Sequence, residues 1–161
     1  MEIKNGTVKD YENAVDTYSD MVYRIACHNL KSKADCDDVV QEVFIKLLQS
    51  EINYDNAERL KAWLIKVTIN KCRDTNKSFW NRKRVALDEV TEAVCNETEL
   101  SIKDEINLLP QKDRNIVYLY YFEEYSIKEI ADILNMKTAT VGSRLSRARE
   151  KLKILLEQEE D

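Results

Sequence analysis

Glycine and proline are almost absent from this chain, and their scarcity limits the folds that it can adopt. Its 161 residues include two glycines and one proline. Tight turns, hairpins and glycine-rich phosphate loops all depend on these residue types, so the composition predicts an all-helical fold. Neither the GxGxxG pattern of dinucleotide-binding loops nor the GxxxxGK(S/T) pattern of P-loops occurs in the chain. This absence argues against both chemistries.

Charge along the chain falls into blocks that the net charge of −5 conceals. Residues 61–84 include eight basic residues and one acid, whereas residues 88–105 include seven acids and one lysine. The carboxy-terminal part is again rich in lysine and arginine. Any single charged run is usually a solvated face, but two basic modules around an acidic connector indicate local phosphate-binding surfaces. We therefore expect two small helical domains, residues 5–84 and 104–158, joined by a flexible acidic linker at residues 85–103.

The amino-terminal domain is predicted to contain two amphipathic helices. The first covers residues 38–49, with Val40 and Phe44 in the core and with a polar face made of Asp38, Gln41, Glu42 and Lys46. The second runs from Arg59 to about Asn76 and buries an apolar stripe that includes Trp63. Its opposite side carries a basic, amide-bearing stripe of Lys66, Asn70, Arg73 and Lys77. Such a stripe can neutralise phosphates and hydrogen-bond base edges, although its spacing would also fit a solvated face.

The carboxy-terminal domain has the pattern of a helix-turn-helix. Pro110 is expected in the first turn of one helix, and a capping box at Ser126 and Glu129 is expected to begin the next. That helix should break at residues 135–137, where Thr138 can cap the last helix. The last helix has a buried stripe of Val141, Leu145, Ala148 and Leu152 and an outward face of Thr140, Ser143, Arg144, Arg147 and Lys151. Because arginine and hydroxyl groups read base edges in the major groove, DNA binding is favoured over a plain amphipathic hairpin.

Five segments, taken together, point to one known family. The first two are residues 37–47, DDVVQEVFIKL, and residues 61–67, KAWLIKV, which Asn70 follows one turn later. The others are Leu109-Pro110, residues 125–131 (YSIKEIA) and residues 140–152 (TVGSRLSRAREKL). In this order they resemble conserved regions 2 and 4 of the extracytoplasmic-function (ECF, group IV) sigma factors of the sigma-70 family. The resemblance is specific because separate motifs span nearly the whole chain in the right order.

The resemblance implies a sigma factor that binds core RNA polymerase and directs promoter-specific transcription initiation, in a stress or envelope response. Polymerase would bind the polar face of the region-2 helix, at Asp38, Gln41 and Glu42. The next helix would melt and capture the promoter −10 element through Lys66, Asn70, Lys71 and Arg73. The −35 element would be contacted by Thr140, Ser143, Arg144 and Arg147, with Arg149 and Lys151 on phosphates. Residues 50–58 correspond to the family's base-selecting loop, and Gly142 stands where the family commonly has a basic residue.

The family also implies a regulatory partner and a cellular location. Its members are commonly held inactive by an anti-sigma factor, so we expect one for this chain. The start of the chain is polar and no apolar run is long enough to span a bilayer, so we expect a cytoplasmic protein with no membrane insertion. The scattered cysteines are expected to be reduced thiols: Cys27, Cys36, Cys72 and Cys95.

Two alternatives fit less of the sequence. A free-standing helix-turn-helix regulator would need only the carboxy-terminal domain and leaves the region-2 resemblance unexplained. An enzyme with a di-metal site on Asp37, Asp38 and Glu42 would need Glu-x-x-His pairs on several helices. His28 is the only histidine, so we expect no catalytic site, no metal and no cofactor.

Overall fold

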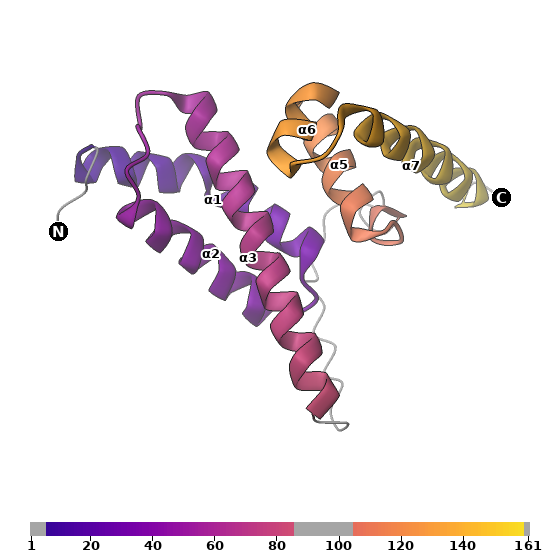
Figure 1. Ribbon diagram of the computed structural model, residues 1–161, viewed down its shortest axis with the longest axis horizontal. Helices are drawn as coiled ribbons and strands as arrows, with labels where there is room; N and C mark the ends of the chain where they lie inside the picture. The colour runs from indigo at the N-terminus through magenta and orange to yellow at the C-terminus, as the bar shows by residue number, and fades with distance from the viewer. Residues whose placement is uncertain (1–5, 86–104, 160–161) are drawn as a thin grey trace. The chain divides into compact units, whose positions relative to one another are not determined.

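The computed structural model describes residues 6–85 and 105–159, and every long regular element within them is an α-helix (Figure 1). The chain divides into two compact units, Met1–Asn96 and Glu97–Asp161, which we call the amino-terminal and carboxy-terminal units. The all-helical prediction is therefore confirmed for these residues. The predicted linker lies outside the described residues, apart from its first residue, Val85. None of the described helices is both long and apolar enough to cross a membrane.

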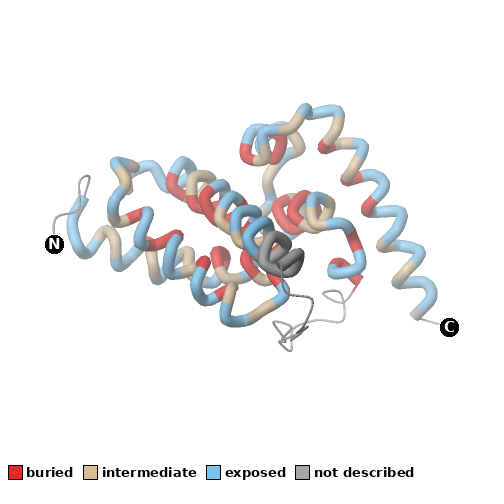
Figure 2. The backbone as a smooth tube through the Cα atoms, turned by 60° about the horizontal axis from the view of Figure 1, so that its bottom comes forward, coloured by how far each residue is buried: buried red, intermediate tan, exposed pale blue. Residues whose placement is uncertain are grey.

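The amino-terminal unit consists of α1 (Val8–Asn29), α2 (Lys33–Gln49) and α3 (Ala57–Val85). Each helix packs against the other two. Their shared core includes Val22, Ile25, Val39, Val43, Leu47, Leu64 and Ile65. Figure 2 shows such buried positions recurring along the helices between exposed ones. The predicted apolar stripes of α2 and α3 are largely confirmed, since Phe44, Leu60 and Val67 are also buried, whereas Val40 and Trp63 are half-buried.

The helix α1 has no counterpart among the predicted elements. A capping box begins it: the Thr7 hydroxyl accepts from the backbone N–H of Asp10, and the Asp10 carboxylate accepts from the N–H of Thr7 at 2.9 Å. Aspartate in place of the usual Glu or Gln at this position disguises the motif in the sequence. The helix α2 also begins earlier than predicted, at Lys33, after a cap at Ser32. The helix α3 extends past the predicted end, because neither glycine nor proline interrupts it.

Two long-range hydrogen bonds fasten the ends of α1. The Tyr11 hydroxyl donates to the backbone carbonyl of Phe44 in α2, at 2.9 Å. At the other end, the side-chain amide of Asn76 in α3 donates to the carbonyl of Asn29, also at 2.9 Å. These contacts, together with the apolar core, fix α1 against both of the helices that carry the predicted functional faces.

The carboxy-terminal unit consists of α5 (Gln111–Tyr121), α6 (Ile127–Leu134) and α7 (Thr138–Glu159). The helix α7 packs on both of the others. The core of this unit includes Ile106, Leu109, Ile116, Leu119, Ile130, Val141, Leu145 and Ala148. The pair α6 and α7, with a tight turn between them, is the predicted helix-turn-helix.

The capping box predicted for α6 is present in full. The Ser126 hydroxyl accepts from the backbone N–H of Glu129 at 3.1 Å, and the Glu129 carboxylate accepts from the N–H of Ser126 at 3.0 Å. At the other end, Asn135 adopts a left-handed conformation with φ of 54°, and the N–H of Met136 donates to the carbonyl of Ala131. Asparagine tolerates this conformation better than most residues. The break predicted after α6 is therefore confirmed.

Two predicted helix starts are wrong by one position. Pro110 precedes α5 with an extended ψ of 150°, so it occupies the cap position rather than the first turn. Proline fits there because the N–H that it lacks would find no partner within the helix. Thr138 is the first residue of α7 rather than its cap, and the first helical bond runs from the N–H of Val141 to the carbonyl of Lys137. A capping hydroxyl needs an extended backbone, which a helical Thr138 lacks.

Removing the Ser126 hydroxyl should destabilise the carboxy-terminal unit. Because Ser126→Ala loses the bond to the N–H of Glu129, we expect the free energy of unfolding to fall by about 0.5–2 kcal/mol. Thermal unfolding followed by circular dichroism measures this, and Ser146→Ala, at an exposed site inside α7, is the control. Unchanged stability of the Ser126 variant at neutral pH would contradict the capping role.

The same variant has an expected pH dependence. Hydrogen bonds from the backbone and then the side chain of Ser126 lower the pKa of Glu129. A group whose folded pKa is lowered contributes stability above its unfolded pKa, and this contribution is lost as pH falls through the folded pKa. The backbone N–H of Ser126, the larger cause, remains in Ser126→Ala, so the variant loses only the side-chain contribution. The difference in the free energy of unfolding between the wild type and Ser126→Ala, measured by thermal unfolding over a pH series, should therefore become smaller in acid without disappearing.

Candidate functional site

The exposed side of α3 presents the polar stripe that spacing predicted. This stripe, the α3 basic face, consists of Lys66, Asn70, Arg73 and Lys77, which are all exposed. On the opposite side of the helix, Leu64 and Cys72 are fully buried. Thr68 is buried as well, and its hydroxyl donates to the carbonyl of Leu64 at 2.6 Å. Because the buried side is fixed in the core, the basic stripe faces solvent.

The polar side of α2 forms a second surface, the α2 acidic face. Its predicted members Asp38, Gln41 and Glu42 are all exposed. The Nζ atom of Lys71, which was predicted for −10 binding, lies 3.8 Å from a carboxylate oxygen of Glu42. The two side chains are 32% and 54% exposed, so the ion pair contributes only about 0–1 kcal/mol to stability. The structure thus brings one residue predicted for polymerase binding next to one predicted for DNA binding.

The segment from Ser50 to Glu58 connects these two faces. Its own side chains close its turns: the Asn53 side chain accepts from the N–H of Asp55 at 2.8 Å. The Asn56 side chain accepts from the N–H of Arg59 at 3.1 Å and thereby caps α3. The segment predicted to select −10 bases therefore leads directly into the helix that carries the α3 basic face.

The first half of α7 carries a shallow hollow, which we call the α7 hollow. It is lined by small and hydroxyl-bearing residues and one arginine: Ala139, Gly142, Ser143, Ser146 and Arg147. Ser143, Arg147 and Lys151 are exposed, and Thr140 is half-buried. The Nε atom of Arg147 donates to the carbonyl of Ser143 at 3.4 Å, so this side chain lies along the helix surface. Hydroxyl and guanidinium groups on an exposed helix are suited to hydrogen-bonding base edges and phosphates.

Arg144 does not share this outward orientation, which corrects the predicted outward face of α7. Its Nη1 atom lies 3.0 Å from a carboxylate oxygen of Asp113 in α5, as a hydrogen-bonded ion pair. The Arg144 side chain is 30% exposed and that of Asp113 only 15%. The sequence could not predict this pair, because the two residues belong to different helices and lie 31 positions apart.

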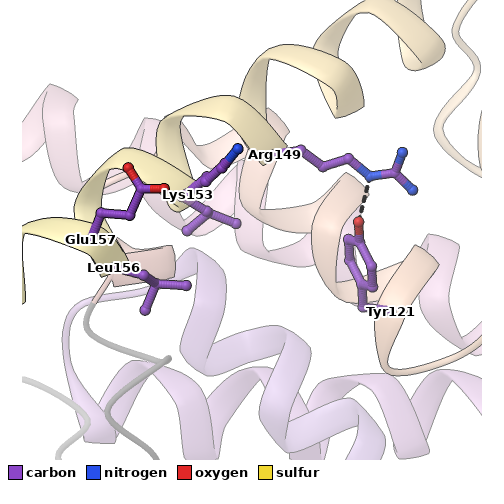
Figure 3. Close-up of a pocket in the computed structure, with 6 residues that line it drawn as sticks. Tyr121, Arg149, Lys153, Leu156 and Glu157 are labelled. Atoms are coloured by element: carbon purple, nitrogen blue, oxygen red, sulfur yellow. Dashed lines mark hydrogen bonds between the residues drawn. The ribbon is translucent and has the colours of Figure 1, made fainter. Parts of the chain in front are cut away.

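Arg149 is also held against α5, as Figure 3 shows. Its guanidinium carbon lies 5.1 Å from the centre of the Tyr120 ring and 5.5 Å from that of Tyr121. These distances are typical of cation–π contacts. The Nε atom also donates to the Tyr121 hydroxyl, and this bond raises the pKa of Arg149. The side chain predicted for phosphate contact therefore already has aromatic partners within its own unit.

An exposed apolar surface in this region was absent from the predictions. Tyr121, Phe122 and Leu156 are 49%, 47% and 40% exposed. Tyr121 and Leu156 line a shallow hollow together with Leu152 (Figure 3). The sequence does contain a sign of this surface, the run Tyr120-Tyr121-Phe122. Three successive aromatic residues cannot all lie on the buried face of one helix, so at least one must be exposed. Clustered exposed apolar side chains are characteristic of protein-contact surfaces.

The described cysteines carry thiols rather than disulfides. Cys36 and Cys72 are buried and Cys27 is half-buried. Burial raises the pKa of Cys72 to about 12, so this thiol stays protonated and unreactive at neutral pH. Within residues 6–85 and 105–159, no group of three or more His, Cys, Asp or Glu side chains could hold a metal ion. Cys95 lies outside the described residues.

Comparison with known proteins gives consistent matches over most of the chain. The family model for Sigma-70 region 2 matches residues 14–84, and the model for Sigma-70, region 4 matches residues 99–152. The chain is 32% identical to the RNA polymerase sigma factor SigV of Bacillus subtilis, over 86% of each chain. It is 29% identical to the ECF RNA polymerase sigma factor SigW of the same species, over 94% of this chain and 91% of SigW.

Two solved structures share the fold. One is the sigma factor RpoE in complex with the anti-sigma factor NepR from Bartonella quintana, with a TM-score of 0.77 and 22% identity. That match covers 93% of this chain and 98% of RpoE. The other is CnrH in complex with the cytosolic domain of CnrY, with a TM-score of 0.66 and 24% identity. It covers 95% of this chain and 91% of the other.

Replacing Gly142 by alanine should stabilise the carboxy-terminal unit. A Cβ atom at this position would meet nothing within 4 Å, and the residue lies inside α7. Glycine in a helix interior is less stable than alanine by roughly 0.5–1 kcal/mol, so Gly142→Ala should raise the free energy of unfolding by about that amount. Thermal unfolding measures the change, and Ser146→Gly, on the same face, should lower stability. A lower melting temperature for Gly142→Ala would mean that the position is packed.

Proposed function

This chain belongs to the ECF group of the sigma-70 family of RNA polymerase sigma factors, and from this premise we propose that it binds core RNA polymerase and directs it to specific promoters. The observation that carries the proposal is the presence of both matched regions in one chain, in order. Each region also contains at least one helix with a buried stripe on one side and a polar face on the other. These are the α2 acidic face and α3 basic face in one unit, and the α7 hollow in the other.

Core polymerase binds, in this proposal, to the α2 acidic face. Asp38, Gln41 and Glu42 are exposed on a helix whose other side is fixed in the core by Val39 and Val43. The face is therefore formed before binding, and no ordering of the helix is required at that moment. Its two carboxylates favour a basic surface on the polymerase, because complementary charges guide association.

The promoter −10 element binds the α3 basic face. Lys66 and Arg73 are placed to neutralise phosphates, and Asn70 lies between them to hydrogen-bond an extruded base. Unstacking a base costs a few kcal/mol, which hydrogen bonds in the complex would offset. Lys71 joins this face at its edge, where Glu42 holds it in the unbound protein. Promoter phosphates can replace this partner because the ion pair is exposed and weak.

The promoter −35 element binds the helix-turn-helix at the α7 hollow. Ser143 and Arg147 line the hollow, Thr140 is half-buried on the same helix, and Lys151 is exposed further along α7. The small residues of the hollow leave room for the edge of a DNA groove to approach the helix. The additional arginines Arg144 and Arg149 contact other side chains within the unit.

Membership of the sigma-factor family also bears on catalysis and on cellular location. Sigma factors confer specificity while the polymerase carries out the chemistry, so we propose that this chain has no catalytic site and acts in the cytoplasm, with the polymerase. The structures of RpoE and CnrH are complexes with NepR and CnrY, respectively. By analogy with these complexes, we propose that the present chain also binds an anti-sigma factor. A free-standing helix-turn-helix regulator is not favoured, because the region-2 match covers residues 14–84.

Transcription in vitro tests the proposal. Core RNA polymerase of Bacillus subtilis, the species of SigV and SigW, is incubated with a genomic fragment library with and without the full chain. New start sites that share two spaced upstream elements are the expected result. The double reversal Asp38→Lys and Glu42→Lys should abolish these starts and weaken co-elution with core polymerase, because it inverts the charge of the α2 acidic face.

The matched control for this variant is Glu12→Lys with Asp16→Lys, which reverses two exposed acids on α1. This control should keep both activities. If the wild-type chain yields no start sites and fails to co-elute with core polymerase, the proposed function is wrong. If the Asp38 and Glu42 variant binds polymerase as well as the control does, the contact lies on another face.

Asn70 should act in promoter melting rather than in polymerase binding. Because Asn70 is exposed on the α3 basic face, Asn70→Ala should weaken the open complex by about 1–3 kcal/mol and leave affinity for core polymerase unchanged. Permanganate reactivity of promoter thymines measures melting, and co-elution measures polymerase affinity. The variant Lys77→Ala, on the same face but without an assigned base contact, is the comparison. Loss of polymerase binding by Asn70→Ala would instead assign the residue a structural role.

A further inference from the structure

Arg144 occupies a different environment from its neighbour Arg147 on the same helix. Arg147 is exposed and lines the α7 hollow. Arg144 turns toward α5, where its Nη1 atom is 3.0 Å from the Asp113 carboxylate. Its Nε atom is buried and has no hydrogen-bond partner among the described residues. The guanidinium is thus partly enclosed at the α5–α7 contact, with only 30% of the side chain exposed.

The burial of Asp113 makes this ion pair difficult to open. The Asp113 side chain is 15% exposed, so withdrawal of Arg144 toward DNA would leave a mostly buried carboxylate without its cation. Removing one partner of a buried pair is far more costly than the net value of the pair itself. By contrast, the atoms of the Lys71–Glu42 pair are 3.8 Å apart and the Glu42 side chain is 54% exposed, so water can solvate this carboxylate when the lysine leaves it.

From this geometry we propose that Asp113 is a positioning residue for promoter recognition, which restrains Arg144 at the α5–α7 contact so that discrimination at the −35 element falls to Arg147 and Ser143. The proposal rests on the proposed function, because it concerns how the helix-turn-helix reads its element. Arg144 then joins the recognition helix to α5 rather than reading a base. Asp113 also prevents a second arginine from forming sequence-independent phosphate contacts beside the hollow.

The restraint has a measurable consequence in salt dependence. An arginine released to the phosphate backbone adds about one released counterion to binding, so the slope of log affinity against log salt steepens by about one. Because phosphate contacts carry no sequence information, affinity for any DNA rises while discrimination falls. Asp113→Asn should therefore strengthen binding to a scrambled −35 element, steepen the salt slope by about one and reduce discrimination severalfold.

The experiment uses the full chain in holoenzyme with core polymerase, on a promoter found by the transcription assay and on the same promoter with its −35 element scrambled. Affinities are measured over a series of salt concentrations. Asp132→Asn is the matched control, since it removes one exposed acid from α6 of the same unit. The control should leave the salt slope and the discrimination between the two promoters near wild-type values. Arg147→Ala should reduce discrimination about 5- to 150-fold, as expected for loss of a base contact.

A double variant distinguishes an effect on DNA binding from a loss of folding. Asp113→Asn combined with Arg144→Met removes both buried charges, a change that proteins often tolerate, and melting curves verify the fold. We expect this double variant to recover wild-type discrimination to within about twofold, because Arg144 reads no base and is no longer available to phosphates. A tenfold or greater loss in the double variant would make Arg144 a base reader and overturn the proposal.

Two further outcomes distinguish a failure of the positioning role of Asp113 from a failure of the proposed −35 binding by the helix-turn-helix. If Asp132→Asn steepens the salt slope as much as Asp113→Asn does, the effect is one of general charge and the positioning role is wrong. If scrambling the −35 element has no effect on the wild-type holoenzyme, the assignment of the helix-turn-helix in the proposed function is wrong.

Discussion

Each proposed binding face of this protein is the reverse side of a buried stripe, and this amphipathic constraint fixes the direction in which the face points. In α3, Leu60 and Leu64 lie in the core. In α7, Val141 and Leu145 do the same. Rotation of either helix about its axis would expose these side chains, at about 1.5–3 kcal/mol for each large one. The polar faces are therefore held in fixed directions before a partner arrives.

Burial also determines which basic side chains are available to DNA in a chain whose net charge is −5. Lys71 and Arg144 each pair with an acid on a neighbouring helix. The Lys71 pair is long and its acid, Glu42, is exposed, so salt and competing phosphates weaken it readily. The Arg144 pair is shorter and its acid is mostly buried, so it acts as part of the packing between α5 and α7. The two ion pairs therefore differ in role. The Lys71–Glu42 pair can exchange its acid for another anion, whereas the Arg144–Asp113 pair contributes to the packing of α5 on α7.

Features that are local in the sequence could be predicted, whereas features that depend on a distant partner could not. The capping box at Ser126 and Glu129 is readable because its members are three residues apart. The apolar stripes are readable because helical periodicity determines them. The ion pair of Arg144 was not readable, since Asp113 is brought to it only by the packing of α5 on α7. The helix α1 was missed although its buried stripe, which includes Met21, Val22 and Ile25, is also local; the aspartate at position 10 disguised its capping box.

The three arginines of the segment SRLSRAR differ in the partners that the fold gives them. Successive residues of an α-helix are rotated by about 100°, so Arg144, Arg147 and Arg149 cannot share one narrow stripe. Arg147 lies at the α7 hollow, Arg144 meets Asp113, and Arg149 stacks on Tyr120 and Tyr121. The latter two contact α5, which provides a carboxylate for one and aromatic rings for the other. Charge type marks α7 as the helix proposed to bind nucleic acid, and its packing on α5 gives Arg144 and Arg149, but not Arg147, partners on the neighbouring helix.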